Sequence, residues 1–137
     1  MRLHRLVSAL FLALVLAVGE VGLGQETDTR WLIGIWKGQQ TRTAYTTQVE
    51  AEFKSEGGEV RWDLEVTTQN AQTSKARGTA KVSGETVTMQ GQYYAGPACC
   101  WGLSYTLSRK GNVLEGTGIG ANSATFQVYW RKGKEGA

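Results

Sequence analysis

Cys99 and Cys100 have the most reactive side chains in this 137-residue sequence, and they are adjacent. Neighbouring Cα atoms lie about 3.8 Å apart across a trans peptide, whereas ordinary disulfides span roughly 4.4–6.8 Å. A bond between these two sulfurs therefore requires a distorted or cis peptide. Three states stay open: a vicinal disulfide, a reduced pair with buried thiols, and bridges between chains. A vicinal ring would form a rigid plate beside Trp101, suited either to cover a sugar or aromatic ligand or only to stiffen its loop.

The histidine content excludes several kinds of catalytic centre. The one histidine is His4, which lies in a segment expected to be removed on export. Without imidazole the mature chain has no histidine general base, no Ser-His or Cys-His nucleophile and no histidine-containing zinc site. Adjacent cysteines alone do not predict a metal site, and the glycine-rich segment 116–120 is strand-like, with no helix after it to hold a phosphate. We expect neither a metal nor a cofactor.

Four carboxylates are the remaining candidates for catalysis, because glycoside hydrolases use a pair of them. They are Glu50, Glu52, Asp63 and Glu65. Each alternates with apolar residues, so we expect all four to face solvent. A barrel enzyme such as an isomerase or a cyclase would need carboxylates that point inward. The sequence therefore favours a binding protein and not an enzyme.

Residues 1–24 have the pattern of a secretory signal peptide. A basic start and an apolar run over 6–18 precede glycines at cleavage-like spacing. A membrane-spanning helix needs about 20 apolar residues, and Glu20 interrupts this run early. An uncleaved anchor is the alternative. The remaining residues, 25–137, predict one secreted or periplasmic domain with no integral membrane segment.

Alternation of apolar and polar residues with a period of two runs through this domain. Its clearest example is the pair of segments 45–54 and 60–67, which flank Gly57-Gly58, since glycine accepts the positive φ of tight hairpin turns. Further strands are expected over 36–43, 75–82, 86–93, 103–107, 114–119 and 124–130. Short turns between them predict antiparallel neighbours. We expect an all-β fold, an eight-stranded antiparallel up-and-down barrel, because closure removes exposed edges. A two-sheet sandwich is the alternative.

Bulky side chains on the apolar faces of these strands are the candidate ligand-binding residues. Aromatic rings bury large areas and carry polar tips that can orient a guest. An eight-stranded barrel has an interior that side chains fill or that holds one small ligand. The small residues Ala76, Gly78 and Ala80 are expected to leave space along one wall. The candidates are Tyr45, Trp62, Met89, Tyr93, Tyr105 and Phe126, with Phe53 a further inward aromatic; the same residues would equally make a filled core.

The segment Gly34-Ile35-Trp36 resembles the Gly-x-Trp opening of the lipocalins and the wider calycin group. The resemblance implies that Trp36 begins the first strand and plugs the closed end of a barrel. It also implies that Arg131, near the last strand, packs over Trp36, so that Gly34, Trp36 and Arg131 form a structural lock. A ligand cavity is then expected at the opposite, open end. The chain is shorter than ordinary lipocalins, lacks their middle motif and C-terminal helix, and is more similar to compact bacterial lipocalin-like domains.

The sequence thus predicts an exported lipocalin-like protein that binds a small, partly hydrophobic molecule. Burial of apolar ligand surface, at about 25 cal/mol per Å², would supply the affinity. The alternative is a protein-interaction or envelope-structural module with a filled, ligand-free barrel. Charges of both signs alternate along the strands, as in Arg61-Trp62-Asp63, so no nucleic-acid partner is expected.

Overall fold

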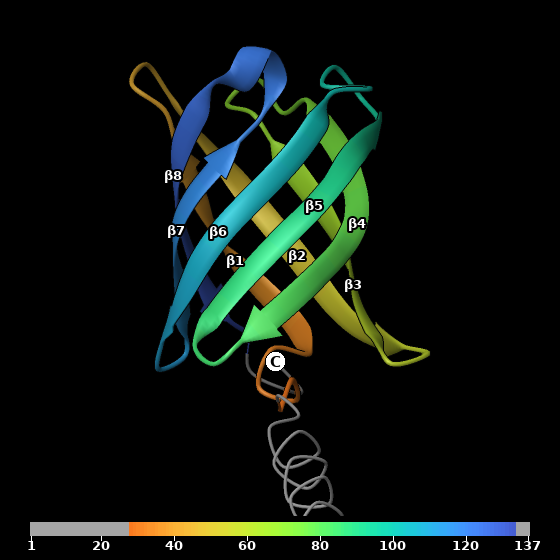
Figure 1. The fold of residues 1–137 in the computed structure, drawn as a ribbon. Coiled ribbons are helices and arrows are strands. Elements are labelled where there is room, and N and C mark those ends of the chain that lie inside the picture. The colour runs from red at the N-terminus through yellow and green to blue at the C-terminus, as the bar shows by residue number, and fades with distance from the viewer. Residues whose placement is uncertain (1–27, 134–137) are drawn as a thin grey trace, which may run out of the picture.

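The alternating segments form eight antiparallel strands that close into a barrel (Figure 1). The computed structural model describes residues 28–133; the signal peptide expected over residues 1–24 lies outside them. The predicted all-β up-and-down barrel is confirmed, and the two-sheet sandwich is not formed. In the described part of the chain, no helix has the length and apolar character needed to cross a membrane.

Each strand is hydrogen-bonded to its neighbours in sequence, and the first strand also pairs with the last. The strands are β1 (Gly34–Thr41), β2 (Thr46–Glu56), β3 (Glu59–Thr67), β4 (Thr73–Ser83), β5 (Thr86–Ala95), β6 (Gly102–Lys110), β7 (Val113–Ile119) and β8 (Thr125–Lys132). A short 3₁₀ turn, Ala121–Ser123, lies between β7 and β8. Inward residues are mostly buried and outward ones mostly exposed along the strands, as the alternation predicts.

The two ends of the barrel have different connections. At one end the strands are joined by tight turns at 57–58, 84–85 and 111–112. Gly57 and Gly58 both have positive φ, 58° and 83°, as a two-residue type I′ turn requires. At the other end, which we call the open end, longer loops span 42–45, 68–72, 96–101 and 120–124. These loops are the part of the barrel that can surround a guest.

The interior of the barrel is filled by aromatic side chains. Tyr105 meets three rings edge-on, with centroid distances of 6.4 Å to Trp62, 5.6 Å to Phe126 and 5.1 Å to Trp130. None of these four side chains is more than 2% exposed. Edge-to-face pairs contribute about 0.5–1.5 kcal/mol each beyond the burial of area. The centre of the barrel is therefore a packed core.

Gly78 and Gly91 make room for the Trp62 indole. The two glycines are paired across β4 and β5. A Cβ at Gly91 would lie 2.5 Å from Cζ2 of Trp62, and one at Gly78 would lie 2.7 Å from the same atom. The indole N–H donates to the carbonyl of Thr79 at 2.8 Å and fixes the ring against this wall. The expectation that the small residues of β4 leave space is therefore wrong at Gly78, because Trp62 occupies it.

Trp36 and the residues before β1 close the other end of the barrel. The buried Trp36 donates its Nε1–H to the carbonyl of Leu32 at 2.8 Å. Nζ of Lys132 lies 5.4 Å from the Trp36 ring centroid and donates to the carbonyls of Trp31 and Ile33, both at 2.6 Å. Gly34, at φ 126°, lies against the Lys132 stem, since a Cβ there would be 3.3 Å from Cε. The lock at this end is therefore formed by Gly34, Trp36 and Lys132.

Arg131 does not pack over Trp36, so that expectation is wrong. Its guanidinium lies on the outside of β8 and donates to the Tyr129 hydroxyl at 3.2 Å. The cause is the strand alternation itself. Trp130 points inward and is fully buried, so Arg131 points outward and Lys132 points inward again.

Candidate functional site

A cavity of about 220 Å³, which we call the open-end pocket, lies between the loops of the open end. It is lined by Gln40, Arg42, Tyr45, Thr47, Val66, Thr68, Ser74, Tyr93, Pro97 and Ala98. Most of these residues stand where strands enter or leave the loops. Pockets for drug-sized ligands usually measure about 300–1,000 Å³, so this pocket fits a smaller guest.

Gln40 forms the floor of the open-end pocket. Its side chain is 2% exposed, and its amide carbonyl accepts a hydrogen bond from the Tyr105 hydroxyl. Thr47 supports the same residue from β2, with Oγ1 3.4 Å from the Gln40 main-chain carbonyl. Because Tyr105 belongs to the aromatic core, the pocket ends at this layer. It is a shallow bowl above a filled barrel.

The loop 96–101 forms one wall and is fastened to the start of β4. The N–H of Ala98 donates to Oγ of Ser74 at 3.0 Å. Gly96 lies so close to β4 that a Cβ would be 2.6 Å from Cα of Ser74. Its φ of 87° is also one that glycine adopts at no steric cost. Both features fix where Pro97 and Ala98 stand beside the pocket.

The same loop contains the two cysteines. In the structure Cys99 and Cys100 form a vicinal disulfide across a cis peptide. Gln92 on β5 donates from Nε2 to the carbonyl of Cys100 at 2.9 Å. Trp101 follows and is 47% exposed, outside the open-end pocket. The disulfide therefore lies beside the pocket wall, within the loop that forms it.

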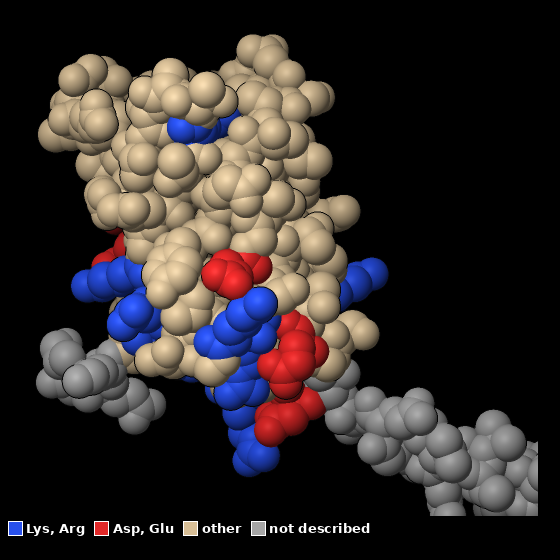
Figure 2. Space-filling view, turned by 90° about the vertical axis from the view of Figure 1, so that its left-hand side faces the viewer, with Lys and Arg blue, Asp and Glu red and all other residues tan. Residues whose placement is uncertain are grey.

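Arg42 carries the only charge in the loops of the open end. The segments 42–45, 68–72, 96–101 and 120–124 contain no Asp, Glu or Lys and no other Arg. Figure 2 shows the same contrast on one face, where the charged side chains gather over the lower part and the upper part is tan apart from one blue area. The Arg42 guanidinium carbon lies 4.8 Å from the Phe126 ring centroid and 5.8 Å from that of Tyr45. The pocket therefore has a single cationic group among neutral ones.

Burial and the Arg42 charge act in opposite directions on the tyrosines near the pocket. Burial raises the pKa of Tyr93, while the positive charge of Arg42 opposes this rise. Burial also raises the pKa of Tyr105 far above its usual value, against smaller lowering effects from Arg42 and from the hydrogen bond with Gln40. Both phenols are therefore neutral hydrogen-bonding groups at physiological pH.

The structure separates the predicted ligand-binding residues into two groups. Tyr93, buried, and Tyr45 line the open-end pocket. The expectation that Tyr45 points into the barrel is wrong, because Tyr45 lies at the mouth of the pocket and is 46% exposed. The N–H of Arg42 donates to the Tyr45 carbonyl at 2.9 Å and turns the chain. As a result, β1 ends at Thr41 and not near residue 43. The others lie in the packed core, below the pocket: Trp62, Met89, Tyr105 and Phe126, together with Phe53.

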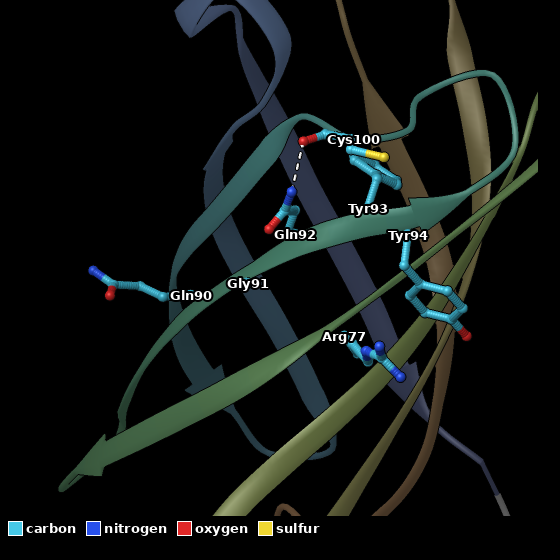
Figure 3. A pocket seen from close by; sticks show the side chains of 7 residues that line it. All are labelled: Arg77, Gln90, Gly91, Gln92, Tyr93, Tyr94 and Cys100. Atoms are coloured by element: carbon cyan, nitrogen blue, oxygen red, sulfur yellow. Dashed lines mark hydrogen bonds between the residues drawn. The ribbon is translucent and has the colours of Figure 1, made fainter.

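A larger hollow of about 600 Å³ lies on the outside of the barrel (Figure 3). It is an open groove lined by Arg77, Gln90, Gly91, Gln92, Tyr93, Tyr94 and Cys100. The Arg77 guanidinium lies 4.6 Å from the Tyr94 ring centroid. In Figure 3 the Tyr93 and Tyr94 side chains point to opposite sides of β5. The groove is thus a polar outer surface, separated from the pocket by the barrel wall.

Strand bending explains this groove without a ligand. Two further outer hollows, of about 310 and 350 Å³, occur on other parts of the wall. Each of the three contains a strand glycine, Gly91, Gly38 or Gly116, at which a Cβ would collide with the main chain of a neighbouring strand. Glycine in a strand marks a sharp bend or a close approach. The outer hollows follow from the curvature of a small barrel, so the open-end pocket is the better candidate site.

The four carboxylates considered for catalysis lie on the outer face, as their alternation predicts. Lys37 pairs with Glu50 at 3.4 Å, Lys75 with Glu65 at 3.6 Å, and Lys54 with both Glu52 and Asp63 at 3.8 and 3.2 Å. Each is about half exposed. Across residues 28–133, no group of three histidine, cysteine or acidic side chains is arranged to hold a metal ion.

No protein-family model and no curated protein matches this chain. The barrel fold and its closed end are therefore known from the geometry of the structure alone.

Eight of the ten residues that line the pocket were not among the candidates from the sequence, and Gln40, Arg42 and Ser74 are three of these eight. Gln40 and Ser74 are polar residues at inward positions, which a pattern of alternating apolar residues does not mark. Arg42 was included in the opening strand. One signal for it was present, because it is an isolated charge in a long neutral stretch, from Gln39 to Gln48.

Proposed function

We propose that this protein is an exported, lipocalin-like binding protein that holds a small, partly hydrophobic molecule in the open-end pocket, and that it is not an enzyme. The observation that carries the proposal is a pocket between the open-end loops that combines apolar surface with several convergent polar groups. Val66, Pro97 and Ala98 supply apolar surface, and Gln40 and Tyr93 supply polar groups. This combination is typical of small-molecule sites.

Export is supported by two features of different kinds. The composition of residues 1–24 is that of a signal peptide. A disulfide such as Cys99–Cys100 is typical of secreted and periplasmic compartments, where thiols are not kept reduced. These features support the proposal that the protein is secreted or periplasmic.

Binding can be tested with the purified protein and a fragment library of neutral, anionic and cationic small amphiphiles. We expect two-dimensional NMR to show shift changes at Gln40, Val66 and Tyr93 for some of them. Ala98→Phe should fill the pocket and abolish these changes. Ala44→Phe is the matched control, since Ala44 is an exposed residue of another open-end loop and does not line the pocket. If no fragment affects the pocket, or if Ala98→Phe binds as well as the control, the proposal fails.

A protein-interaction module with a filled barrel is the second candidate. It is favoured by large apolar side chains that are exposed near the open end, namely Tyr45, Tyr94, Trp101 and Ile119. In that case Trp101→Ser should abolish capture of a specific partner while Ala98→Phe should not. The opposite pattern, with fragments lost in Ala98→Phe, favours the small-molecule function.

A further inference from the structure

Arg42 is a partly buried cation without a negative partner. In the described part of the chain, no carboxylate forms an ion pair with it and its guanidinium donates no hydrogen bond. Removing a charge from water is costly unless the charge is paired. Other basic side chains on the barrel wall, such as Lys37, Lys54 and Lys75, do have carboxylate partners. The one charge in the open-end loops thus lacks a counter-ion.

Neighbouring groups hold this guanidinium at the pocket. It lies over the Phe126 ring, 4.8 Å from its centroid. A Cβ on Gly120 would be 3.3 Å from the guanidinium Nη2, so the side chain also reaches the β7–β8 loop. A guanidinium over a ring face keeps its five N–H donors in its own plane. Those donors are the groups that bind a planar oxyanion with two parallel hydrogen bonds.

The positive charge of Arg42 acts on Tyr93, which lines the pocket, and on Tyr105 in the core below it. Its positive charge opposes the rise that burial causes in the pKa of both Tyr93 and Tyr105. It therefore favours negative charge in the region between these hydroxyls and the mouth.

Building on the function proposed above, we propose that the ligand is a small organic monoanion, with its carboxylate bound by Arg42 and its apolar body against Val66, Pro97 and Ala98. The charge count sets the class of head group. One cation balances one carboxylate, whereas a phosphate dianion would keep an unbalanced charge in a loop region that holds no second cation. The volume of about 220 Å³ restricts the body to roughly a single ring or a short chain.

The test compares phenylacetate with phenylacetamide, which has nearly the same shape and no charge. Isothermal titration and NMR shift mapping give the affinity and the place of binding for each probe. We expect phenylacetate to bind the open-end pocket more tightly, and Arg42→Gln to weaken it by roughly tenfold to a hundredfold, as for the loss of a hydrogen-bonded charge. Phenylacetamide should bind Arg42→Gln as it binds the unchanged protein.

Arg77→Gln is the matched control variant. Arg77 is also an arginine over an aromatic ring, 4.6 Å from the Tyr94 centroid, but it lies in the outer groove. We expect it to bind phenylacetate as the unchanged protein does. Thermal unfolding of both variants checks that the barrel is intact, and Arg42→Lys, which keeps the charge without the planar fork, should retain part of the affinity.

Four results would overturn the inference. If Arg42→Gln binds phenylacetate as tightly as the unchanged protein, or if the two probes bind with equal affinity, Arg42 does not recognise the carboxylate. In both cases the pocket can still bind neutral fragments, and the proposed function stands. If Arg77→Gln alone loses phenylacetate, the anion site is the outer groove. If phenylacetate does not bind, the inference fails. The proposed function fails as well only if neutral fragments also cause no NMR shift changes at the pocket residues.

Discussion

Arg131 and Lys132 are adjacent, equally charged residues on opposite sides of the barrel wall. Nζ of Lys132 donates to two carbonyls at 2.6 Å and lies over the Trp36 ring. The Arg131 guanidinium contacts the exposed Tyr129 hydroxyl. When an ammonium group that bonds to partly buried carbonyls is removed, those acceptors are left without a partner. The two residues therefore make very different contributions to the stability of the closed end.

We expect Lys132→Met to lower the free energy of unfolding by roughly 2–3 kcal/mol, because it removes charge-assisted hydrogen bonds and a cation–π contact. Arg131→Met should change it by less than about 0.5 kcal/mol, as for most surface substitutions. Urea denaturation of the two variants measures both values. Equal losses would show that Lys132 does not hold the closed end.

At the scale of single residues, the sequence predicted which side chains are buried better than which side chains meet. Trp62, Met89 and Tyr105 are inward as expected, since alternation along a strand fixes the face. The family resemblance placed Arg131 over Trp36, although the alternation of β8 puts Arg131 on the outer face. Tyr45 was predicted to point inward from the alternation of residues 45–54. The hydrogen bond between Arg42 and Tyr45 ends β1 and forms a turn, so this alternation does not extend to Tyr45. Such a turn depends on one hydrogen bond and has no glycine or proline to mark it.

The strands use glycine to combine curvature with a large interior side chain. Gly91 is at an inward position of β5, against Trp62. Gly102 on β6 is at an outward position, where a Cβ would meet no atom within 4 Å. Two glycines on adjacent strands thus have opposite structural importance. Only the first is required by packing.

This difference predicts that Gly91→Ala lowers the free energy of unfolding by about 1–3 kcal/mol or more, through overpacking against the Trp62 ring and the β4 main chain. Gly102→Ala has free space and should stay within about 0.5 kcal/mol of the unchanged protein. Chemical denaturation followed by tryptophan fluorescence compares the pair. A tolerated Gly91→Ala would mean that the Trp62 ring can move away from this wall.

The elements at the two ends differ in how far they could be predicted. The tight turns carry glycines at the required positions, such as Gly57 and Gly58, and were expected from the sequence. The open-end loops are shaped by bonds to distant residues, such as the Ala98 N–H to Ser74 Oγ across 24 positions. A local pattern does not contain that information. The candidate site lies among these loops, and so only Tyr45 and Tyr93 of its lining were predicted.

At the scale of the whole molecule, charge is distributed unevenly between the two ends of the barrel, and the floor of the pocket is hydrogen-bonded to the aromatic core. On the face shown in Figure 2 the charges gather toward the closed end, and the open-end loops are neutral apart from Arg42. Tyr105 connects these regions, since its ring is at the centre of the aromatic core and its hydroxyl bonds to the floor of the pocket. The protonation state of the Tyr105 hydroxyl therefore affects the stability of the folded barrel.

The free energy of unfolding should fall as the pH rises above about 10. Burial raises the pKa of Tyr105 far above the value of 10.0 expected in the unfolded chain, and it raises that of Tyr93 as well. Below pH 10 both states keep these protons and stability is unaffected. Above it the unfolded chain loses them first, which costs up to about 1.4 kcal/mol per pH unit for each tyrosine until the folded pKa is reached.

Denaturation curves at several alkaline pH values measure this slope. Tyr105→Phe should make the slope shallower, although it also lowers stability at neutral pH because the Gln40 amide loses its donor. Tyr129→Phe, at an exposed position, should leave the slope as it was. An unchanged slope in Tyr105→Phe would locate the alkaline sensitivity elsewhere.

The pairing of β1 with β8, from Trp36–Lys132 to Thr41–Gln127, joins two strands that are far apart in the chain. Every other strand pair joins chain neighbours. The barrel therefore closes only when its first and last strands meet. Before this step, a partly folded sheet has two unpaired edges, the condition that favours pairing with other chains. Closure by β8 thus protects all the other strands from aggregation.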